Sequence, residues 1–288
     1  MAQAHILMCE PVYYGVEYEI NPWMDRRRQP DHQRALGQWR DLRRLIEEAG
    51  ASVSCLAPVA GLPDLVFTAN AALVYRGTAI LSQFRHPQRR GEQPYDREWF
   101  IAHGFEVRQL SSGAPFEGAG DALFCGDILF AGYRIRSDIR ALQEIGKLLH
   151  LLVIPLELVD PYFYHLDTCF CPVAPGVVFY YPPAFDEYAQ RVLEETVDEL
   201  VPVSEVEARR FACNSVVIGK TVLTPVGCPE FHAQLAAREY RAMETPLDEF
   251  IKAGGAAKCL TLRLDGEEAA AWAEQARRKR MQAVESLS

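Results

Sequence analysis

Four segments of the chain share one pattern: an apolar run, a short turn that contains glycine, and a second apolar run. They span residues 64–84, 115–137, 164–182 and 210–227. Short apolar runs joined by tight turns of this kind are typical of β-hairpins. The pattern returns roughly every 50 residues, and such a period is typical of a repeat architecture. The chain is therefore predicted to contain four repeated units, each of which opens with a hairpin.

Amphipathic stretches separate the hairpins. Residues 31–50 carry apolar side chains at helical spacing and end at Gly50, which is a common helix stop. Ser137 stands where a later helix would need an N-cap. The expected helices span 31–50, 92–103, 137–150, 183–200 and 229–243, and short apolar strands are expected at 51–59, 104–110 and 150–158. Each unit is thus predicted to be a hairpin, a helix and one further strand.

The two ends of the chain supply a fifth unit in this interpretation. Residues 4–11 and 256–264 are apolar runs, and we predict that they pair with each other. Joining the chain ends in this way removes the exposed edge strands of an open array of sheets. The chain has no Ser/Gly-rich linker and no block of charge that would divide it. We therefore expect one α/β domain over residues 1–288, closed into a ring, with a last surface helix at 265–288.

The composition is that of an ordinary globular protein with an acidic balance. Of 288 residues, 49% are hydrophobic and 24% are charged, and a formal net charge of −9 argues against non-specific binding of nucleic acid. No apolar run approaches the roughly 20 residues of a membrane helix. The N-terminus lacks the basic start and long apolar core of a secretory signal. We therefore expect a cytoplasmic protein that binds neither nucleic acid nor membrane and whose eight cysteines are thiols.

Polar residues recur at one position of the repeat, near the start of the first strand of each hairpin. In a ring, equivalent positions of successive units converge on the centre, so these side chains are predicted to line a pocket. Residues i and i+2 of a strand point to the same face, so His165 and Asp167 are expected to meet one substrate together. The residues of this set are Asn70, Glu117, Asp121, His165, Asp167 and Asn214.

Cys259 is the candidate nucleophile. It follows two glycines in AGGAAKCLTLRL and is expected at the start of a strand, with Lys258 beside it to favour the reactive thiolate. Cysteine, histidine and carboxylates together form the set that nucleophilic catalysis with general acid–base help requires. Composition alone favours the other interpretation, in which Cys259 is a small buried core residue.

A metal site is the main alternative for the histidine. His165, Cys169 and Cys171 form H-x3-C-x-C, and two of these side chains could face a zinc ion. However, the chain has no Cys-x-x-Cys pair and no second Cys/His cluster. Phosphate-loop and dinucleotide-binding motifs are also absent. We therefore expect neither a metal nor another cofactor.

Four motifs, in order along the chain, resemble those of the guanidino-group-modifying enzyme superfamily, the penteins. They are FEGAGD, YHLDTCFCP, ACNSVVIGK and GGAAKCLTL, and the resemblance covers nearly the whole chain. VEYEINPWM and FTANAALV are most similar to arginine dihydrolases and their dimethylarginine dimethylaminohydrolase-like relatives. The resemblance implies a five-bladed α/β propeller of ββαβ repeats with pseudo-fivefold symmetry.

The resemblance also implies roles for matching residues. Cys259 matches the nucleophile, His165 the general acid/base, and Glu117 the acid that pairs with the guanidinium or with the histidine. Asp167 matches the carboxylate that grips the guanidinium. Separately from these matches, Arg85 and Arg136 follow hairpins and are expected partners of the substrate carboxylate, and Asn21 is expected to cap the amino-acid end of the substrate. Asp121 is expected either to orient its own loop or to bind the amino group of the substrate.

One position departs from part of the superfamily. Deiminases and amidinotransferases carry an Arg-Asp pair where this chain has Ala69 and Asn70. Asparagine has nearly the shape of aspartate, but it is neutral and can donate as well as accept hydrogen bonds. Our hypothesis is that Asn70 can hold a neutral urea as well as a guanidinium, so that a first product stays bound for a second hydrolysis.

The leading interpretation is a hydrolase that attacks the guanidinium carbon of L-arginine through a covalent thiouronium. Two rounds would give ornithine, carbon dioxide and two ammonia. The alternative at the same site is dimethylarginine hydrolysis to citrulline and dimethylamine. From a different class, a non-catalytic arginine sensor would bind without turnover and leave Cys259 unreactive. The expected partner is a small guanidino compound, and a homo-oligomer is compatible with the sequence.

Overall fold

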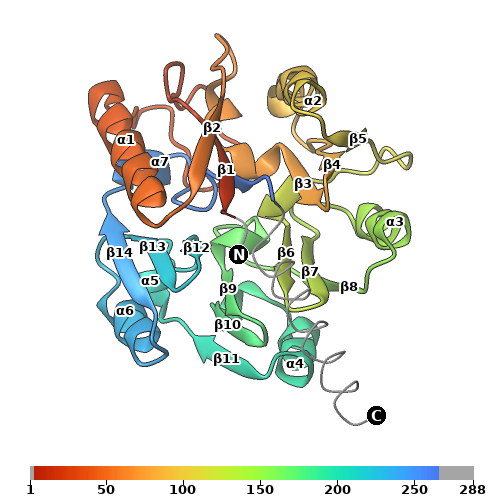
Figure 1. Ribbon diagram of the computed structural model, residues 1–288, viewed down its shortest axis with the longest axis vertical. Coiled ribbons are helices and arrows are strands. Elements are labelled where there is room, and N and C mark those ends of the chain that lie inside the picture. The colour runs from red at the N-terminus through yellow and green to blue at the C-terminus, as the bar shows by residue number, and fades with distance from the viewer. Residues whose placement is uncertain (1–2, 266–288) are drawn as a thin grey trace.

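The structure, a computed structural model, describes residues 3–265 and arranges them as five three-stranded sheets around a common centre (Figure 1). Four of the sheets pair an antiparallel hairpin with a third strand that runs parallel to the second. All four hairpins lie inside the segments in which the sequence predicts them. The surface helix expected at 265–288 falls almost wholly outside the described residues.

The strands have these bounds. The hairpins are β3 (Ala72–Tyr75) with β4 (Thr78–Leu81), β6 (Ala122–Cys125) with β7 (Ile128–Tyr133), β9 (Phe170–Ala174) with β10 (Val177–Tyr180), and β12 (Val216–Ile218) with β13 (Thr221–Pro225). The third strands are β5 (Glu106–Arg108), β8 (Val153–Glu157), β11 (Glu199–Pro202) and β14 (Arg241–Thr245).

The fifth sheet joins the two ends of the described chain, as predicted. β15 (Leu262–Arg263) pairs antiparallel with β1 (His5–Cys9), which in turn pairs parallel with β2 (Ser52–Leu56). The partners of β15 are Ile6 and Leu7. Because β15 has only two residues, Cys259 lies in the turn before it and not on the strand.

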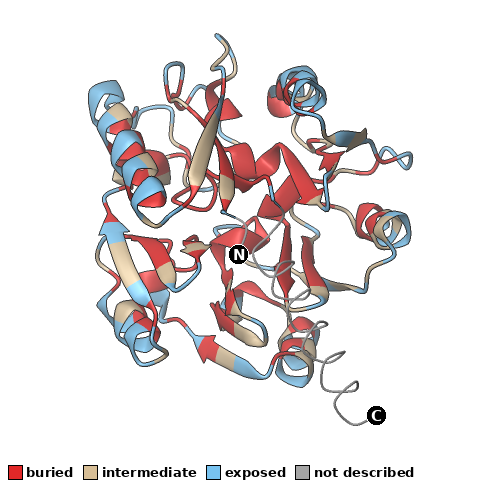
Figure 2. Ribbon diagram, in the orientation of Figure 1, coloured by how far each residue is buried: buried red, intermediate tan, exposed pale blue. Residues whose placement is uncertain are grey.

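Helices cover the outside of the ring (Figure 1). Each of the five longest lies between the hairpin, or β1, and the last strand of its sheet: α1 (His32–Glu48), α2 (Gln93–Ala102), α3 (Ile139–Leu149), α4 (Glu187–Thr196) and α6 (Pro229–Ala236). Their buried residues face inward and their exposed residues face solvent (Figure 2). Two shorter helices are α5 (Glu205–Ala208) and α7 (Asp248–Ile251).

Two helix predictions were wrong in detail. Asp138, and not Ser137, is the N-cap of α3, because the Asp138 side chain accepts a hydrogen bond from the backbone N–H of Arg140. The helix expected over 229–243 ends at Ala236, and residues 241–245 form β14 instead. The backbone of β14 hydrogen-bonds to β13 along its whole length, so sheet pairing overrides the local helical pattern there.

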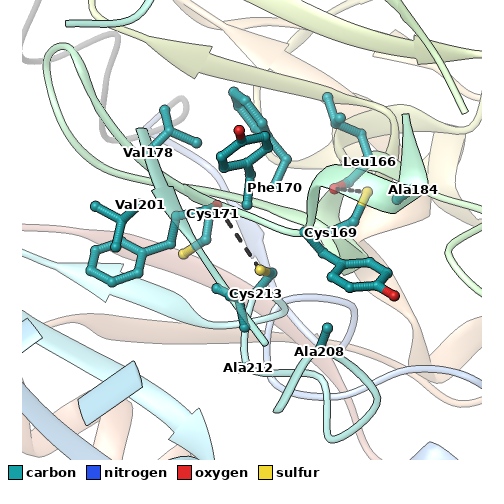
Figure 3. Packing of buried hydrophobic residues seen from close by; sticks show 14 of the residues in the cluster. Leu166, Cys169, Phe170, Cys171, Val178, Ala184, Val201, Ala208, Ala212 and Cys213 are labelled. Atoms are coloured by element: carbon teal, nitrogen blue, oxygen red, sulfur yellow. Dashed lines mark hydrogen bonds between the residues drawn. The ribbon is translucent and has the colours of Figure 1, made fainter. Parts of the chain in front are cut away.

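Buried cysteines belong to the packed interior, as Figure 3 shows for one part of the largest core cluster. Cys169, Cys171 and Cys213 lie among Phe170, Val178 and several alanines. Burial raises the pKa of each of these thiols. All eight cysteines are free, as expected, and Cys55 is exposed. Residues 3–265 contain no helix long and apolar enough to cross a membrane.

Two glycines with equal space around them make a matched test of the backbone. An added Cβ at exposed Gly37, inside α1, or at Gly77, in the β3–β4 turn, meets no atom within 4 Å. Only Gly77 has a positive φ, of 78°. Gly37→Ala is expected to stabilise the protein by about 0.5–1 kcal/mol. Gly77→Ala is expected to destabilise it by about 1–2 kcal/mol. Thermal unfolding midpoints that moved in the same direction would contradict this assignment.

Candidate active site

Short 3₁₀ turns precede the first strand of three of the four hairpins, and the polar residues of those hairpins lie in these turns or next to them, not on the strands. Thr68–Asn70, Gly118–Gly120 and Leu166–Thr168 each form one such turn directly before β3, β6 and β9. The strand geometry predicted for His165 and Asp167 was therefore wrong: His165 is the extended residue before the turn, and Asp167 lies inside it. Both side chains are nevertheless buried at the centre.

The glycines of FEGAGD leave room for the neighbouring unit. Gly118 has a φ of 63°, and a Cβ there would lie 2.8 Å from the Ala69 carbonyl oxygen. A Cβ at Gly120 would overlap the amide nitrogen of Asn70. Asn70 uses that space to donate a hydrogen bond of 3.0 Å to the backbone carbonyl of Glu117. Two units of the ring thus interlock at these glycines.

Glu117 is fully buried, and its side chain accepts from three groups. Oε2 accepts from Arg136 Nη1 and from His165 Nε2, each at 2.8 Å, and Oε1 accepts from the Arg85 backbone N–H at 3.2 Å. Burial alone would raise the pKa of Glu117, but Arg136 and then His165 outweigh it and hold the pKa below its usual value. Glu117 is therefore an ionised carboxylate at neutral pH.

His165 is a neutral imidazole with one nitrogen left over. Burial lowers its pKa to about 4, against the opposing effect of Glu117. Since Nε2 faces the Glu117 carboxylate, Nε2 carries the hydrogen and Nδ1 presents a lone pair. Nδ1 is buried and has no hydrogen-bond partner among the described residues. It is the atom of His165 that is available to take or give a proton.

Cys259 is held by residues from two other units. Its Sγ lies 3.3 Å from Asp167 Oδ2 and 3.1 Å from Asn214 Nδ2. The Asn214 Oδ1 accepts from the backbone N–H groups of Ala256 and Cys259, at 3.0 and 3.2 Å, and so shapes the turn. Burial, followed by the negative charge of Asp167, raises the pKa of Cys259 well above its usual value. The side chain of Cys259 is therefore a thiol at neutral pH.

A narrow cavity lies beside Cys259. Two buried guanidinium groups, Arg89 and Arg136, lie on its wall together with the buried carboxylate of Asp64. Asp64 Oδ1 is buried and has no hydrogen-bond partner among residues 3–265. The other residues of the wall are Ile20, Asn21, Met24, Phe67, Asn70, Tyr164, Ala253 and Cys259. Such a wall suits a small ligand that carries charges of both signs.

The predicted site residues fall into three groups around this cavity. Asn21, Asn70, Arg136 and Cys259 line it. Glu117, His165 and Asp167 do not line it, but Glu117 contacts Arg136, His165 contacts Glu117, and Asp167 contacts Cys259. Asp121 and Arg85 stand apart from it, and both need correction.

Asp121 is a structural acid in this arrangement. Its Oδ2 accepts from the Ser137 hydroxyl at 2.6 Å, and its Oδ1 accepts from the Leu166 backbone N–H at 3.1 Å. It therefore orients the turn that carries Asp167 and does not reach a ligand. Burial raises its pKa well above the usual value.

The sequence predicted that Arg85 binds the substrate carboxylate, but Arg89, and not Arg85, lines the cavity. Arg85 is half-buried, and its Nε donates to the backbone carbonyl of Arg136 at 2.9 Å. Arg89 follows Pro87 in a 3₁₀ turn (Pro87–Glu92), and it is the only arginine of that turn that is buried. Asp64 and Tyr164 were missed as well. The signal available for Asp64 was a single aspartate within the otherwise apolar stretch GLPDLV.

The metal interpretation of His165, Cys169 and Cys171 has no support in the geometry. Cys169 Sγ lies 3.5 Å from the Leu166 carbonyl, while the His165 Nε2 is bound to Glu117. Within the described part of the chain, no group of three or more histidines, cysteines or acids is placed to hold a metal ion.

The state of Cys259 leads to a test of its surroundings. Asp167→Asn removes the charge and the acceptor that raise the thiol pKa, so Cys259 should be alkylated faster by iodoacetamide at pH 8. Asp96→Asn changes a similarly buried acid of α2 that contacts neither the sulfur nor Asp167, so it should leave the rate unchanged. Rates are measured by mass spectrometry in a Cys55→Ser background, because Cys55 is exposed. An unchanged or slower rate in Asp167→Asn would contradict this account of Cys259.

Comparisons with known proteins found a matching family model and similar enzymes that act on arginine or dimethylarginine. Residues 17–265 match the family model described as N,N dimethylarginine dimethylhydrolase, eukaryotic. The bifunctional arginine dihydrolase/ornithine cyclodeaminase ArgZ of Synechocystis is 47% identical over 264 residues, which are 90% of this chain and 37% of ArgZ. The N(G),N(G)-dimethylarginine dimethylaminohydrolase of Mycobacterium tuberculosis is 39% identical over 257 residues, which are 89% of this chain and 84% of that protein.

A solved structure matches at the same level. The N-terminal domain of ArgZ, crystallised with its substrate, has a TM-score of 0.89 and 45% identity to this chain. The match covers 92% of this chain and 99% of that domain, whereas the chain spans only about 37% of the length of ArgZ itself. Since the family model and these relatives each cover most of the chain, the chain belongs to the dimethylarginine dimethylaminohydrolase family.

Proposed function

We propose that this protein hydrolyses the guanidinium group of L-arginine, twice in succession, to ornithine, carbon dioxide and two ammonia. The observation that carries the proposal is the buried Cys259 thiol between Asp167 and Asn214, at a cavity whose wall also holds two buried arginines. ArgZ, an arginine dihydrolase by name, supports the choice of substrate and of two rounds.

The fold assigned to this function is the five-bladed α/β propeller with pseudo-fivefold symmetry, in one catalytic domain. Five sheets of the same size around one centre support it, as does the fifth sheet made from both ends of the described chain (Figure 1). A cytoplasmic location and a homo-oligomer stay predictions.

Charge complementarity orients the substrate in the cavity. Asp167, beside the sulfur, pairs with the guanidinium, because a planar cation is held best by a carboxylate through paired hydrogen bonds. The guanidinium groups of Arg89 and Arg136 attract the carboxylate of the substrate. The unpartnered Oδ1 of Asp64 accepts from its ammonium group. Each charge of arginine thereby meets an opposite one.

The reaction then follows from the protonation states. A guanidinium cation against Asp167 and Cys259 favours the thiolate, whose proton passes to Nδ1 of His165. The thiolate attacks the guanidinium carbon, and His165 returns the proton to the departing ammonia, which leaves a thiouronium on Cys259. His165 next takes a proton from water, which attacks the same carbon and releases citrulline from the sulfur. In the second round the Cys259 thiolate attacks the ureido carbon of citrulline and expels the terminal nitrogen as ammonia, which leaves a carbamoyl group on the sulfur. Water then displaces the sulfur, and the resulting carbamate breaks down to ornithine and carbon dioxide.

Asn70 is the residue assigned to the second round. Its Oδ1 accepts from Arg89 Nη1 at 2.8 Å, and one of its two amide N–H groups donates to the Glu117 carbonyl. The other N–H group can donate to the neutral oxygen of a bound urea, which an aspartate at this position could not do.

Dimethylarginine is the second candidate substrate. The description of the family model and the relative from Mycobacterium tuberculosis favour it. It would use the same nucleophile, with dimethylamine in place of ammonia as the leaving group and citrulline as the end product. No relative named here supports a non-catalytic arginine sensor. A sensor would also not explain why Asp167 and Asn214 contact the sulfur of Cys259.

A direct assay separates these functions. The purified protein is incubated with arginine, dimethylarginine, agmatine and citrulline, and ornithine, citrulline, ammonia and dimethylamine are measured. Ornithine with two ammonia per arginine is the expected result. Citrulline as the final product would overturn the second round, and folded protein without turnover of any guanidine would overturn the enzyme. Cys259→Ser is the inactive control.

Asn70→Asp tests the assignment of Asn70. The aspartate loses the donor to the Glu117 carbonyl and brings a second carboxylate beside it, so a neutral urea is held less well. We expect the second hydrolysis to slow more than the first, and the ratio of citrulline to ornithine to rise. An unchanged product ratio with arginine would remove Asn70 from this role.

A further inference from the structure

Glu92 is a buried carboxylate that no step of the proposed reaction uses. It ends the 3₁₀ turn that carries Arg89 and precedes the first residue of α2. Its side chain is not on the cavity wall, and its relative exposure is 2%. Burying a carboxylate costs free energy unless it meets a cation and hydrogen-bond donors. Packing alone therefore does not explain why a carboxyl group lies at this buried position.

Glu92 meets Arg89 through a two-point pair. Arg89 Nε donates to Oε1 and Arg89 Nη2 donates to Oε2, each at 2.8 Å. Such a pair fixes the plane of the guanidinium as well as its position, because both partners are rigid and planar. The ring of Phe84, 4.5 Å from Arg89 Cζ, covers one face of that plane. Arg89 has little freedom to rotate.

Because the guanidinium plane is fixed, the directions of the Arg89 N–H groups that do not bond to Glu92 are fixed as well. A guanidinium group has five N–H bonds. Two of them go to Glu92, one goes from Nη2 to the Asp64 backbone carbonyl at 3.1 Å, and one goes from Nη1 to Asn70 Oδ1 at 2.8 Å. The fifth, on Nη1, has no partner among residues 3–265 and belongs to a residue of the cavity wall.

The bond to Asn70 has a second consequence. An amide can place its oxygen or its nitrogen toward a given neighbour, and only an acceptor can face Arg89. The Arg89 contact therefore selects the orientation in which Asn70 Oδ1 faces Arg89 and Nδ2 faces Glu117. The same two-point pair thus controls both the carboxylate end of the site and the amide that faces the reacting group.

We propose that Glu92 is a positioning residue of the reaction, which acts through Arg89 to aim one N–H at the substrate carboxylate and to hold Asn70 in its donating orientation. This inference rests on the proposed function. It predicts that loss of the Glu92 charge weakens arginine binding and impairs the second hydrolysis more than the first. If Glu92 only filled space, its replacement would not selectively weaken arginine binding or slow the second hydrolysis.

Asp96 provides a matched control. It lies one helical turn after Glu92 on α2, its relative exposure is 3%, and the described residues give it no hydrogen bond to Arg89. One of its oxygens, Oδ1, is buried without a partner. Asp96→Asn thus removes a neighbouring buried carboxylate from the same helix but leaves the Arg89 pair intact.

The test compares Glu92→Gln with Asp96→Asn. In Glu92→Gln the two-point pair is broken, because the amide offers Arg89 one acceptor oxygen where the carboxyl group offers two, so KM for arginine should rise about tenfold or more. The ratio of citrulline to ornithine should rise in the same variant. Asp96→Asn should stay within about twofold of the unchanged protein in both measurements. Equal losses in both variants, or an unchanged KM and product ratio in folded Glu92→Gln, would overturn the proposal.

Two additions keep the test decisive. Should Glu92→Gln not fold, Glu92→Asp replaces it; the charge is kept but the reach is shortened, and the same change in KM and product ratio is expected to a smaller extent. Calorimetric binding of arginine is also measured in a Cys259→Ser background, where turnover cannot interfere. If the unchanged protein binds arginine but makes neither citrulline nor ornithine, the proposed function fails, while weaker binding with Glu92→Gln in this background still supports the positioning role.

Discussion

The shared oxygen of Glu117 is the interaction on which the centre of this protein depends. One carboxylate oxygen accepts from both Arg136 and His165, each at 2.8 Å, in surroundings without solvent. Without the arginine, burial would drive Glu117 toward its neutral form, and the imidazole would lose the acceptor that fixes its tautomer. Arg136 also lines the cavity, so the same cation stabilises the acid and faces the ligand.

The ring makes this arrangement possible because it brings equivalent turns of different units into contact. Asn70, Glu117 and His165 come from three successive units, and Cys259 comes from the turn before the strand that closes the fifth sheet. Their close approach requires backbone without side chains. Gly118 and Gly120 provide it, since a Cβ at either position would meet Ala69 or Asn70. The glycines of FEGAGD are thus part of the contact between units and not only of a turn.

Electrostatics at this centre separates resting and reacting states. The buried thiol of Cys259 and the neutral imidazole of His165 both carry the protonation state that burial favours. A cationic ligand against Asp167 reverses that preference for the sulfur. Under the proposed function, the site becomes reactive when its cavity holds a guanidinium, and the buried cations Arg89 and Arg136 on the cavity wall favour a ligand that also carries a negative group.

The sequence alone determined the local elements and the identity of the chemical groups. Hairpins at glycine turns and the helix over residues 32–48 follow from patterns within short windows, where hydrophobic periodicity and turn chemistry act. The pairing of the chain ends followed from the repeat, because a ring of units must close to remove its edge strands. The motifs also predicted a catalytic role for Cys259, His165 and Glu117, and the structure places these three residues close to the centre of the ring. Tertiary structure alone decided which of two nearby arginines, Arg85 or Arg89, faces the cavity, and it made Asp121 a support for Leu166. It also placed residues 241–243, which the sequence predicted as the end of a helix, in the strand β14, because the neighbouring hairpin supplies β13 as a partner. These outcomes depend on which groups meet across the ring, and such contacts leave no mark in the local sequence.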